Sequence, residues 1–482
     1  MASQQHLDRL SAVDAGFLAQ EKPNTHMHIG GLALFEGEAP GLEEFLAHIS
    51  SRLHLVPRYR QKLAVPPLET GRPLWVDDPT FNLAYHVRHT ALPEPGDESA
   101  LLAMAARVFS QRLDRSKPLW ELWLVERRSG ERSGGEASGR DRCWALLSKT
   151  HHALVDGVSG VDLASVLFDL TPAGPESVDG DEPWVPQPEP SGAELAARGI
   201  SGAVRAVGEV AAGALGAVSK PGVALDRARE VATGIGEVAW TALNAAPDTP
   251  FNVPPGPHRR LQLVRADLDE LKLVKDAFGT TVNDVVLAVV TGALAYFLQS
   301  RGRRTEGIEL KAAVPVSVRS DDQRGALGNQ LTQIMAPLPV FLDDPLARLR
   351  YVKDAMDGLK ESRQALAASA IASLQGFAPP TIHAQASRLN FSGRFFNLLV
   401  TNVPGPQFPL YVLGRKLSEI FPIPFLAGER ALAIAIMSYD GKVGFGLLAD
   451  YDALPDLDVV SEGIEASLAQ LLTLAETPRP GD

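Results

Sequence analysis

The stretch Thr150-His151-His152-Ala153-Leu154-Val155-Asp156-Gly157 places two adjacent histidines three residues ahead of an Asp-Gly pair. The apolar run Cys143-Trp144-Ala145-Leu146-Leu147 precedes it, and residues 158–170 follow with helical periodicity. This order predicts a buried strand, a sharp loop and a helix. Because imidazole titrates closer to neutrality than any other side chain, a histidine held here can take up and return a proton. We therefore expect the loop to carry proton-transfer chemistry.

Length and charge limit the class of protein. The chain has 482 residues, which is more than one compact core holds, so we expect two or three domains. A net charge of -12 argues against nucleic acid as the main partner. The single cysteine, Cys143, excludes an internal disulfide and suits a reducing cytoplasm. The N-terminus lacks the charged and apolar regions of a signal peptide.

Composition divides the chain into three parts. Residues 171–191 are rich in proline, glycine and acid, and residues 193–246 in alanine, glycine and valine. We predict an N-terminal domain over residues 1–185, a helical linker over 186–256 and a C-terminal domain over 257–482. The longest apolar run, Val285 to Leu298, is too short for the roughly 20 residues of a membrane-spanning helix, so we expect a buried helix.

Hydrophobic patterns predict the elements around these landmarks. A helix is expected over residues 42–55 and another over 99–113, and strands over 27–35 and 118–125. In the second half the pattern predicts strands at residues 309–319, 329–337 and 398–402, a hairpin around Asp440-Gly441-Lys442, and helices at 345–374 and 461–474.

Four interpretations of the histidine pair remain open from the residues alone. One is general-base catalysis, with Asp156 orienting the loop. A metal site is disfavoured because adjacent side chains of an extended strand point in opposite directions and no third ligand follows at zinc spacing. A serine hydrolase is disfavoured because Gly157-Val158-Ser159-Gly160-Val161 lacks the second glycine of the nucleophile elbow. The last is a structural role, a buried histidine satisfied by Asp156.

The residues His151 to Gly157 match the HHxxxDG signature of the CoA-dependent acyltransferase superfamily, which includes chloramphenicol acetyltransferase and peptide-synthetase condensation domains. Several further motifs occur in the order typical of one branch: Pro118-Leu119-Trp120, Asn283-Asp284, Pro315-Val316-Ser317-Val318-Arg319, Leu327-Gly328-Asn329 and Asn402-Val403-Pro404-Gly405-Pro406. Over nearly its whole length the chain resembles the bacterial wax ester synthase/diacylglycerol acyltransferases.

The resemblance implies a fold and a reaction. The fold is α/β with mixed sheets, in which two chloramphenicol-acetyltransferase-like domains form a pseudo-dimer with the active site between them. The reaction transfers a fatty acyl group from acyl-CoA, a co-substrate, to diacylglycerol or a long-chain alcohol. No other cofactor and no metal is expected. Because the substrates are lipids, we expect a cytoplasmic protein bound peripherally to the inner face of the membrane or to lipid inclusions.

The resemblance also implies roles for single residues. His152 is the general base, His151 supports the turn, and Asp156 and Gly157 shape the loop. Asp156 pairs with an arginine in related acyltransferases, and Arg319 is one candidate partner here; a contact with the CoA phosphate is the other role considered for Arg319. The pair Asn283-Asp284 is implied to shape the site from the second domain.

Each of these motifs also has a structural interpretation. Thr281 followed by Asp284 at the start of an apolar helix has the form of a helix cap, and capping and function are weighed equally for Asn283 and Asp284. For Trp120 we expect packing or lining of the acyl pocket. Two rival functions stay open: acyl transfer to a polar or carrier-bound acceptor, and lipid binding without catalysis.

Overall fold

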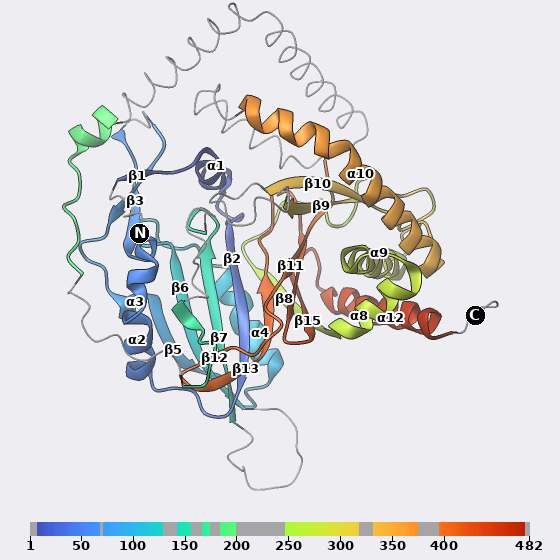
Figure 1. Cartoon of the computed structure of the whole chain (residues 1–482), viewed down its shortest axis with the longest axis horizontal. Helices are drawn as coiled ribbons and strands as arrows, with labels where there is room; N and C mark the ends of the chain where they lie inside the picture. Colours follow the sequence, from blue (N-terminus) through green and yellow to red (C-terminus); the bar gives the residue numbers. More distant parts are fainter. Residues whose placement is uncertain are drawn as a thin grey trace, which may run out of the picture.

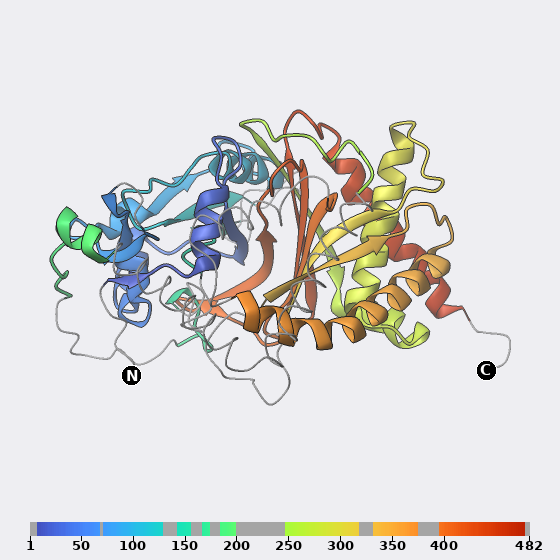
Figure 2. The ribbon, with the colours of Figure 1, turned by 90° about the horizontal axis from the view of Figure 1, so that it is seen from above.

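The computed structural model describes residues 7–67, 71–128, 142–155, 166–173, 184–198, 246–317, 331–374 and 395–477. Two six-stranded sheets lie side by side, each with helices packed against it (Figures 1 and 2). The N-terminal sheet has the order β12 (Tyr411–Val412), β13 (Arg415–Ile423), β2 (His28–Glu36), β7 (Arg142–His151), β6 (Trp120–Arg128) and β5 (Val87–Ala91). The C-terminal sheet has the order β10 (Leu331–Leu338), β9 (Leu310–Ser317), β11 (Leu398–Pro404), β14 (Leu432–Tyr439), β15 (Lys442–Asp450) and β8 (Arg259–Asp267).

Both sheets mix parallel and antiparallel pairs. In the first, β5 runs parallel to β6, and the other pairs are antiparallel. In the second, β11 runs parallel to both β9 and β14. A small sheet of β1 (Asp8–Arg9), β4 (Leu74–Asp77) and β3 (Gln61–Ala64) flanks the N-terminal half. The predicted α/β class with mixed sheets is therefore confirmed.

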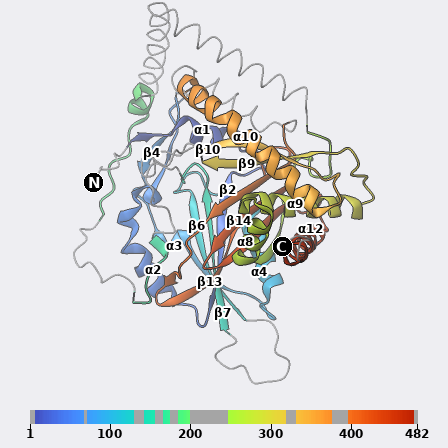
Figure 3. The same cartoon turned by 45° about the vertical axis from the view of Figure 1, so that its right-hand side comes forward.

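Helices cover the sheets as their apolar faces require. The N-terminal half carries α1 (Ala12–Gln20), α2 (Leu42–Ser50), α3 (Leu83–His86) and α4 (Glu98–Phe109). The C-terminal half carries α8 (Leu268–Phe278), α9 (Val282–Ser300), α10 (Pro345–Leu374) and α12 (Leu457–Glu476), which gather on one side of their sheet (Figure 3). The helix expected over residues 42–55 ends at Ser50. Two short 3-10 turns, Leu53–Leu55 and Pro57–Arg60, follow it.

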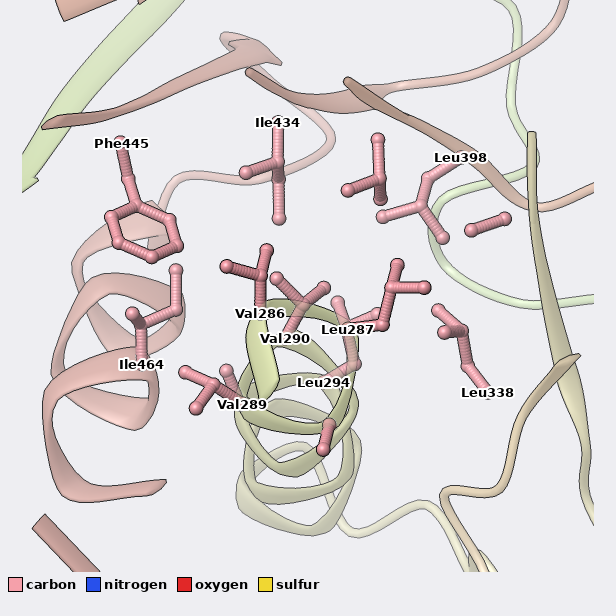
Figure 4. Packing of buried hydrophobic residues seen from close by; sticks show 14 of the residues in the cluster. Val286, Leu287, Val289, Val290, Leu294, Leu338, Leu398, Ile434, Phe445 and Ile464 are labelled. Carbon is pink, nitrogen blue, oxygen red and sulfur yellow. The ribbon is translucent and has the colours of Figure 1, made fainter. Parts of the chain in front are cut away.

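The apolar helix α9 is the centre of the C-terminal core. Val286, Val290 and Leu294 face Leu398 and Ile434 of the sheet, and Ile464 of α12 packs beside them (Figure 4). Among the described helices α9 alone is long and apolar enough to cross a membrane by length and composition, but 78% of that segment is buried inside the fold. The prediction of a buried helix is therefore confirmed.

One segment of the C-terminal half joins the N-terminal sheet. Strand β13 pairs antiparallel with β2, so that Phe421 lies opposite Leu32 and Ile423 opposite Gly30 (Figure 1). Its backbone also crosses β15 so closely that a Cβ on Gly446 would lie 1.8 Å from the Pro422 carbonyl oxygen. The predicted unit of residues 257–482 thus contributes to both sheets, which local sequence patterns did not reveal.

A separate hydrophobic core fills the space between the two sheets. It combines Leu32, Leu34 and Leu147 of the N-terminal half with Leu399 and Leu448 of the C-terminal half. Because side chains of a strand alternate between faces, Lys149 and His151 of β7 point to the same side as Leu147. The histidine pair therefore lies at the end of a strand whose inner face looks toward the other half.

Candidate active site

The two histidines stand where β7 ends. His151 is the last residue of the strand and pairs with His28 of β2, and the chain then turns through His152 to Val155. The His152 amide donates a hydrogen bond to the Met27 carbonyl oxygen (2.8 Å), and the Leu154 amide donates to the His151 carbonyl oxygen (2.9 Å). The loop is thereby tied to the start of β2, which restrains the position of the histidine pair.

The His152 ring is enclosed by aromatic side chains from both halves of the molecule. It stacks on Phe17 of α1 with ring centroids 4.1 Å apart and planes inclined by 26°. Phe425, which follows β13, meets it edge-on at 5.7 Å and 87°. The residue as a whole is half-buried. His152 therefore lies at the meeting of the two halves.

His151 has a different environment. Its side chain is 1% exposed, and its Nδ1 accepts a hydrogen bond from the Ala153 amide at 3.0 Å. An accepting Nδ1 carries no proton, so the ring proton is on Nε2, which lies 3.3 Å from the Glu21 carboxylate. The ring thus joins the loop backbone to a buried acid, which agrees with the supporting role expected for His151.

Glu21 is a site residue that the sequence analysis missed. Its carboxylate is 2% exposed and accepts a hydrogen bond from the Met27 amide (3.2 Å). It forms an ion pair with Arg115 (2.5 Å) and lies 3.5 Å from His28 Nε2. Burial acts to raise the pKa of Glu21, but His151, His28 and Arg115 outweigh burial and hold this pKa well below its usual range. The acid is therefore ionised. It connects His151 with Met27, whose carbonyl oxygen accepts the hydrogen bond from the His152 amide.

No local pattern identified Glu21. Its ion-pair partner Arg115 is 94 residues away along the chain, and His151 is farther still. A carboxylate just after a helix is ordinarily exposed and solvated. Only the tertiary fold, which returns the chain from α1 to the edge of β2, shows that Glu21 is buried beside the histidine pair.

A second buried charge lies on the same face of the sheet. The Lys149 ammonium is fully buried and donates to the Val108 and Gln111 carbonyl oxygens (2.8 and 2.7 Å) and to Glu121 (3.1 Å). Burial lowers the pKa of Lys149, while Glu121 opposes that shift. The contacts with Val108 and Gln111 satisfy carbonyl groups at the C-terminal end of α4. Lys149 therefore fixes α4 against β7.

Trp120 lies on the face of the sheet that is turned away from His151. Its side chain is 1% exposed, its Nε1 donates to the Tyr59 carbonyl oxygen (2.8 Å), and its ring stacks on His86 at 4.6 Å. It belongs to the same core as Leu122 and Leu124, the next residues on that face of β6. Of the two roles expected for Trp120, packing is the one that these contacts describe.

Asp284 caps α9. Its Oδ2 accepts from the Thr281 amide (2.9 Å), and the Thr281 hydroxyl accepts from the Asp284 amide (3.2 Å), which is a complete capping box. Asn283 accepts from the Asn402 side chain at 3.4 Å, which joins two of the predicted motifs. Among the described residues, Asn283 and Asp284 form no hydrogen bond or ion pair with either histidine.

Three predicted site residues, Asp156, Gly157 and Arg319, lie outside the described residues, so the proposed pairing of Asp156 with Arg319 remains a prediction. Most of the helix expected over residues 158–170 lies there too. Cys143 is described, and burial raises the pKa of its thiol. Burial therefore disfavours the thiolate form of Cys143.

Comparisons with known proteins bear on this arrangement. Residues 10–286 match the model of the wax ester synthase/diacylglycerol acyltransferase catalytic domain, and residues 327–472 match the model of the C-terminal domain of that family. Two Mycobacterium tuberculosis proteins are similar over nearly their whole length. The probable diacylglycerol O-acyltransferase tgs1 is 32% identical and covers 98% of this chain and 97% of its own. The probable diacylglycerol O-acyltransferase tgs2 is 33% identical and covers 96% and 99%.

Solved structures are similar as well. The wax ester synthase/diacylglycerol acyltransferase from Marinobacter aquaeolei VT8 is 26% identical, with a TM-score of 0.64 over 98% of this chain and 100% of that one. The trichothecene 15-O-acetyltransferase of Fusarium sporotrichioides, 13% identical with a TM-score of 0.58 over 97% and 95%, shares the fold. The predicted acyltransferase fold is thus confirmed, and the chain belongs to the wax ester synthase/diacylglycerol acyltransferase family, a family of acyltransferase enzymes.

Proposed function

We propose that this enzyme transfers a fatty acyl group from acyl-CoA to the hydroxyl of diacylglycerol, of a long-chain alcohol, or of both, with His152 as the general base. The observation that carries the proposal is the position of the His152 ring between Phe17 of one half and Phe425 of the other. A base at this junction is within reach of two substrates that arrive from different sides. The names of the mycobacterial relatives favour diacylglycerol as an acceptor.

The reaction proceeds in two steps, addition of the acceptor to the thioester and elimination of CoA. Neutral His152 removes the proton of the acceptor hydroxyl while the hydroxyl oxygen attacks the carbonyl carbon of the thioester. The tetrahedral intermediate then expels the CoA thiolate, which takes the proton from the imidazolium. Such base catalysis contributes roughly 10²- to 10⁴-fold in rate. No covalent enzyme intermediate and no cofactor is needed, which suits a chain whose only cysteine has a raised thiol pKa.

The remaining residues act on geometry. We assign His151 to holding the loop, because its Nδ1 binds the Ala153 amide and its Nε2 faces Glu21. Asp156 and Gly157 are assigned to the shape of the same loop, with Arg319 as the partner of Asp156. Asn283 and Asp284 are assigned to shaping the substrate site from the N-terminal end of α9, in addition to the capping role of Asp284.

We propose a peripheral location, on the inner face of the cell membrane or on lipid inclusions, because both the acceptor and the product are neutral lipids. The helix α9 does not serve as an anchor in this proposal, since its apolar residues form the C-terminal core. Membrane attachment then depends on surface contacts, which co-sedimentation of the purified protein with phospholipid vesicles measures.

The test supplies radiolabelled oleoyl-CoA to the purified enzyme with diacylglycerol, with hexadecanol, or without acceptor. We expect labelled triacylglycerol or wax ester and release of CoA only when an acceptor is present. Absence of neutral lipid with either acceptor would contradict the proposal. Transfer of the acyl group to a polar or carrier-bound acceptor, with release of CoA, would then favour the other acyltransferase function, and tight lipid binding without CoA release would favour a non-catalytic protein.

A further inference from the structure

We propose that a groove between α4 and β8 binds the phosphorylated nucleotide end of acyl-CoA. This inference rests on the proposed function and extends it by naming a subsite. The groove has a volume of about 610 Å³ and lies where α4 of the N-terminal half packs against β8 of the C-terminal half (Figure 1). It is separate from the enclosure of Phe17 and Phe425 around His152.

One wall of the groove is built from small side chains. Ser99, Ala103 and Ala106 follow one another at helical spacing on α4 and leave room above the helix surface. The opposite wall carries Arg260 and Gln262 of β8, with His258 just before the strand and Tyr451 just after β15. The helix wall therefore combines these small side chains with Glu98, Leu102 and Arg107 of α4, and the opposite wall is cationic and aromatic.

The cations of the groove are suited to phosphate. Arg107, in the last turn of α4, is exposed and pairs with no carboxylate among the described residues. Arg260 lies with its guanidinium 4.2 Å from the centre of the Tyr451 ring, and its buried Nε has no hydrogen-bond partner in the described part of the chain. Glu98, the acid that lines the groove, is engaged by Arg265 at 2.5 Å. Guanidinium groups bind phosphate with paired, charge-assisted hydrogen bonds.

An aromatic side chain beside these cations points to a nucleotide and not to a free phosphate. Tyr451 is 47% exposed, although large aromatic side chains are ordinarily more buried. Its ring is in contact with Arg260 and, edge-on, with His258 at 6.4 Å. Flat aromatic and guanidinium groups are the surfaces on which a nucleobase stacks. A base with phosphates attached describes the 3′-phospho-ADP end of CoA.

The groove also leads toward the catalytic loop. Arg259, buried at one end of it, donates to the carbonyl oxygens of Gly256 (2.8 Å) and Asn24. Asn24 is three residues from Met27, whose carbonyl holds the His152 amide, and three extended residues span about 10 Å. A nucleotide in the groove would thus lie close to the residues that hold the His152 loop, within reach of its pantetheine arm.

The test is calorimetric titration of the full-length protein with CoA and with 3′-dephospho-CoA. For Arg107→Ala and Arg260→Gln we expect the affinity for CoA to fall roughly tenfold each, because a charge-assisted contact with phosphate is lost. Tyr451→Ala should weaken both ligands, on the order of tenfold, through lost stacking. The exposed Arg304 lies outside the groove, so Arg304→Ala serves as a matched control that leaves both affinities unchanged.

A kinetic arm distinguishes binding from catalysis. With acyl-CoA the groove variants should show a raised KM and an unchanged kcat, and with an acyl-pantetheine thioester, which lacks the nucleotide, they should match the wild type. Melting curves show whether each variant is folded, and Arg260→Lys keeps the charge if Arg260→Gln is unstable.

Equal affinity of the wild type and the groove variants for CoA would overturn the assignment of the groove alone. Failure of the wild type itself to bind CoA would overturn the proposed function, and the assignment with it. Loss of binding to phosphatidylglycerol vesicles in these variants, with unchanged affinity for CoA, would give the groove to a lipid headgroup and contradict the inference.

Discussion

The two sheets have the same number of strands, but the side chains packed around α9 differ in kind from those buried behind the histidine pair. The C-terminal sheet packs on α9, where Val286, Val290 and Leu294 make a core of hydrocarbon. The inner face of the N-terminal sheet buries the ionised groups of Lys149 and Glu21 beside the His151 ring. Burying charge is costly unless each group is paired, so such a network is kept where function needs it. The comparison teaches that the core around α9 is held by apolar packing, whereas the residues behind the histidine pair are held by a network of paired charges.

Removing Glu21 should have the largest effect on the N-terminal network. Glu21→Ala leaves the Met27 amide without its acceptor and removes the charge partner of Arg115, which is 41% exposed, so we expect a loss of about 1–3 kcal/mol in the free energy of unfolding. Because the loop of His152 is tied to Met27, displacement of the loop should also lower kcat by about 100-fold.

Denaturant unfolding and steady-state kinetics measure these two effects. Glu21→Gln keeps the size and an accepting oxygen, and should recover part of the activity. The exposed Glu36→Gln is the matched control and should change neither quantity. A Glu21→Ala enzyme with full kcat would show that the buried acid does not position the loop.

A cavity beside α9 should lower stability without affecting catalysis, in contrast to the Glu21 variant. Leu294 is fully buried, so Leu294→Ala should lower the free energy of unfolding by about 2–5 kcal/mol through lost contacts and the cavity left behind. We expect kcat per folded molecule to remain unchanged below the melting temperature. A fall in kcat without a fall in stability would mean that the C-terminal core also shapes the reacting loop.

Stability should depend on pH through buried histidines of the N-terminal half. Burial lowers the pKa of His26, His28, His48 and His86 below the ordinary value of 6.5. In the unfolded chain these groups bind protons as the pH falls below about 6.5, while the folded protein resists. The free energy of unfolding should therefore decrease from pH 7 to pH 5, by at most about 1.4 kcal/mol per pH unit for each group.

Urea unfolding at pH 5, 6, 7 and 8 checks this slope. The lowered pKa of Glu21 contributes stability that is present above the ordinary value of 4.5 and is lost only below it, so Glu21 does not alter the slope between pH 5 and pH 7. Equal or greater stability at pH 5 would contradict the account of neutral buried histidines.

The smallest expected effect concerns the cap of α9. If Asp284 only caps the helix, Asp284→Ala and Thr281→Ala should each lower the free energy of unfolding by about 1 kcal/mol and leave kcat/KM unchanged. If Asp284 also shapes the substrate site, as proposed, only Asp284→Ala should lower kcat/KM. Comparing the two variants in one assay decides between these roles. Equal kcat/KM in both variants would show that Asp284 does not shape the substrate site.

Local patterns predicted the elements that periodicity defines. The apolar run before the histidine pair predicted β7, the longer apolar run from Val285 predicted α9, and Asp440-Gly441 predicted the hairpin of β14 and β15. In that turn Asp440 and Gly441 have φ of 44° and 82°, the left-handed conformation that such a dipeptide tolerates. Each of these signals resides within a few neighbouring residues.

Long-range pairing was not predictable in the same way. Ile423 of β13 meets Gly30 of β2 nearly 400 residues away, and no local property of either strand names its partner. The contact between Glu21 and His151 has the same origin. The proposed general-base role of His152 rests on the resemblance of its motif, whereas the aromatic enclosure by Phe17 and Phe425 came only from the tertiary structure.

The central claim is that His152 acts as the base at the junction of the two halves. Its most direct test is the single-turnover rate of acyl transfer from radiolabelled oleoyl-CoA to diacylglycerol by His152→Ala, with folding verified by the melting curve. The account predicts a rate about 10²- to 10⁴-fold below that of the wild type, in a protein that still unfolds cooperatively and binds CoA with unchanged affinity. A folded His152→Ala enzyme that forms triacylglycerol at the wild-type rate would contradict it.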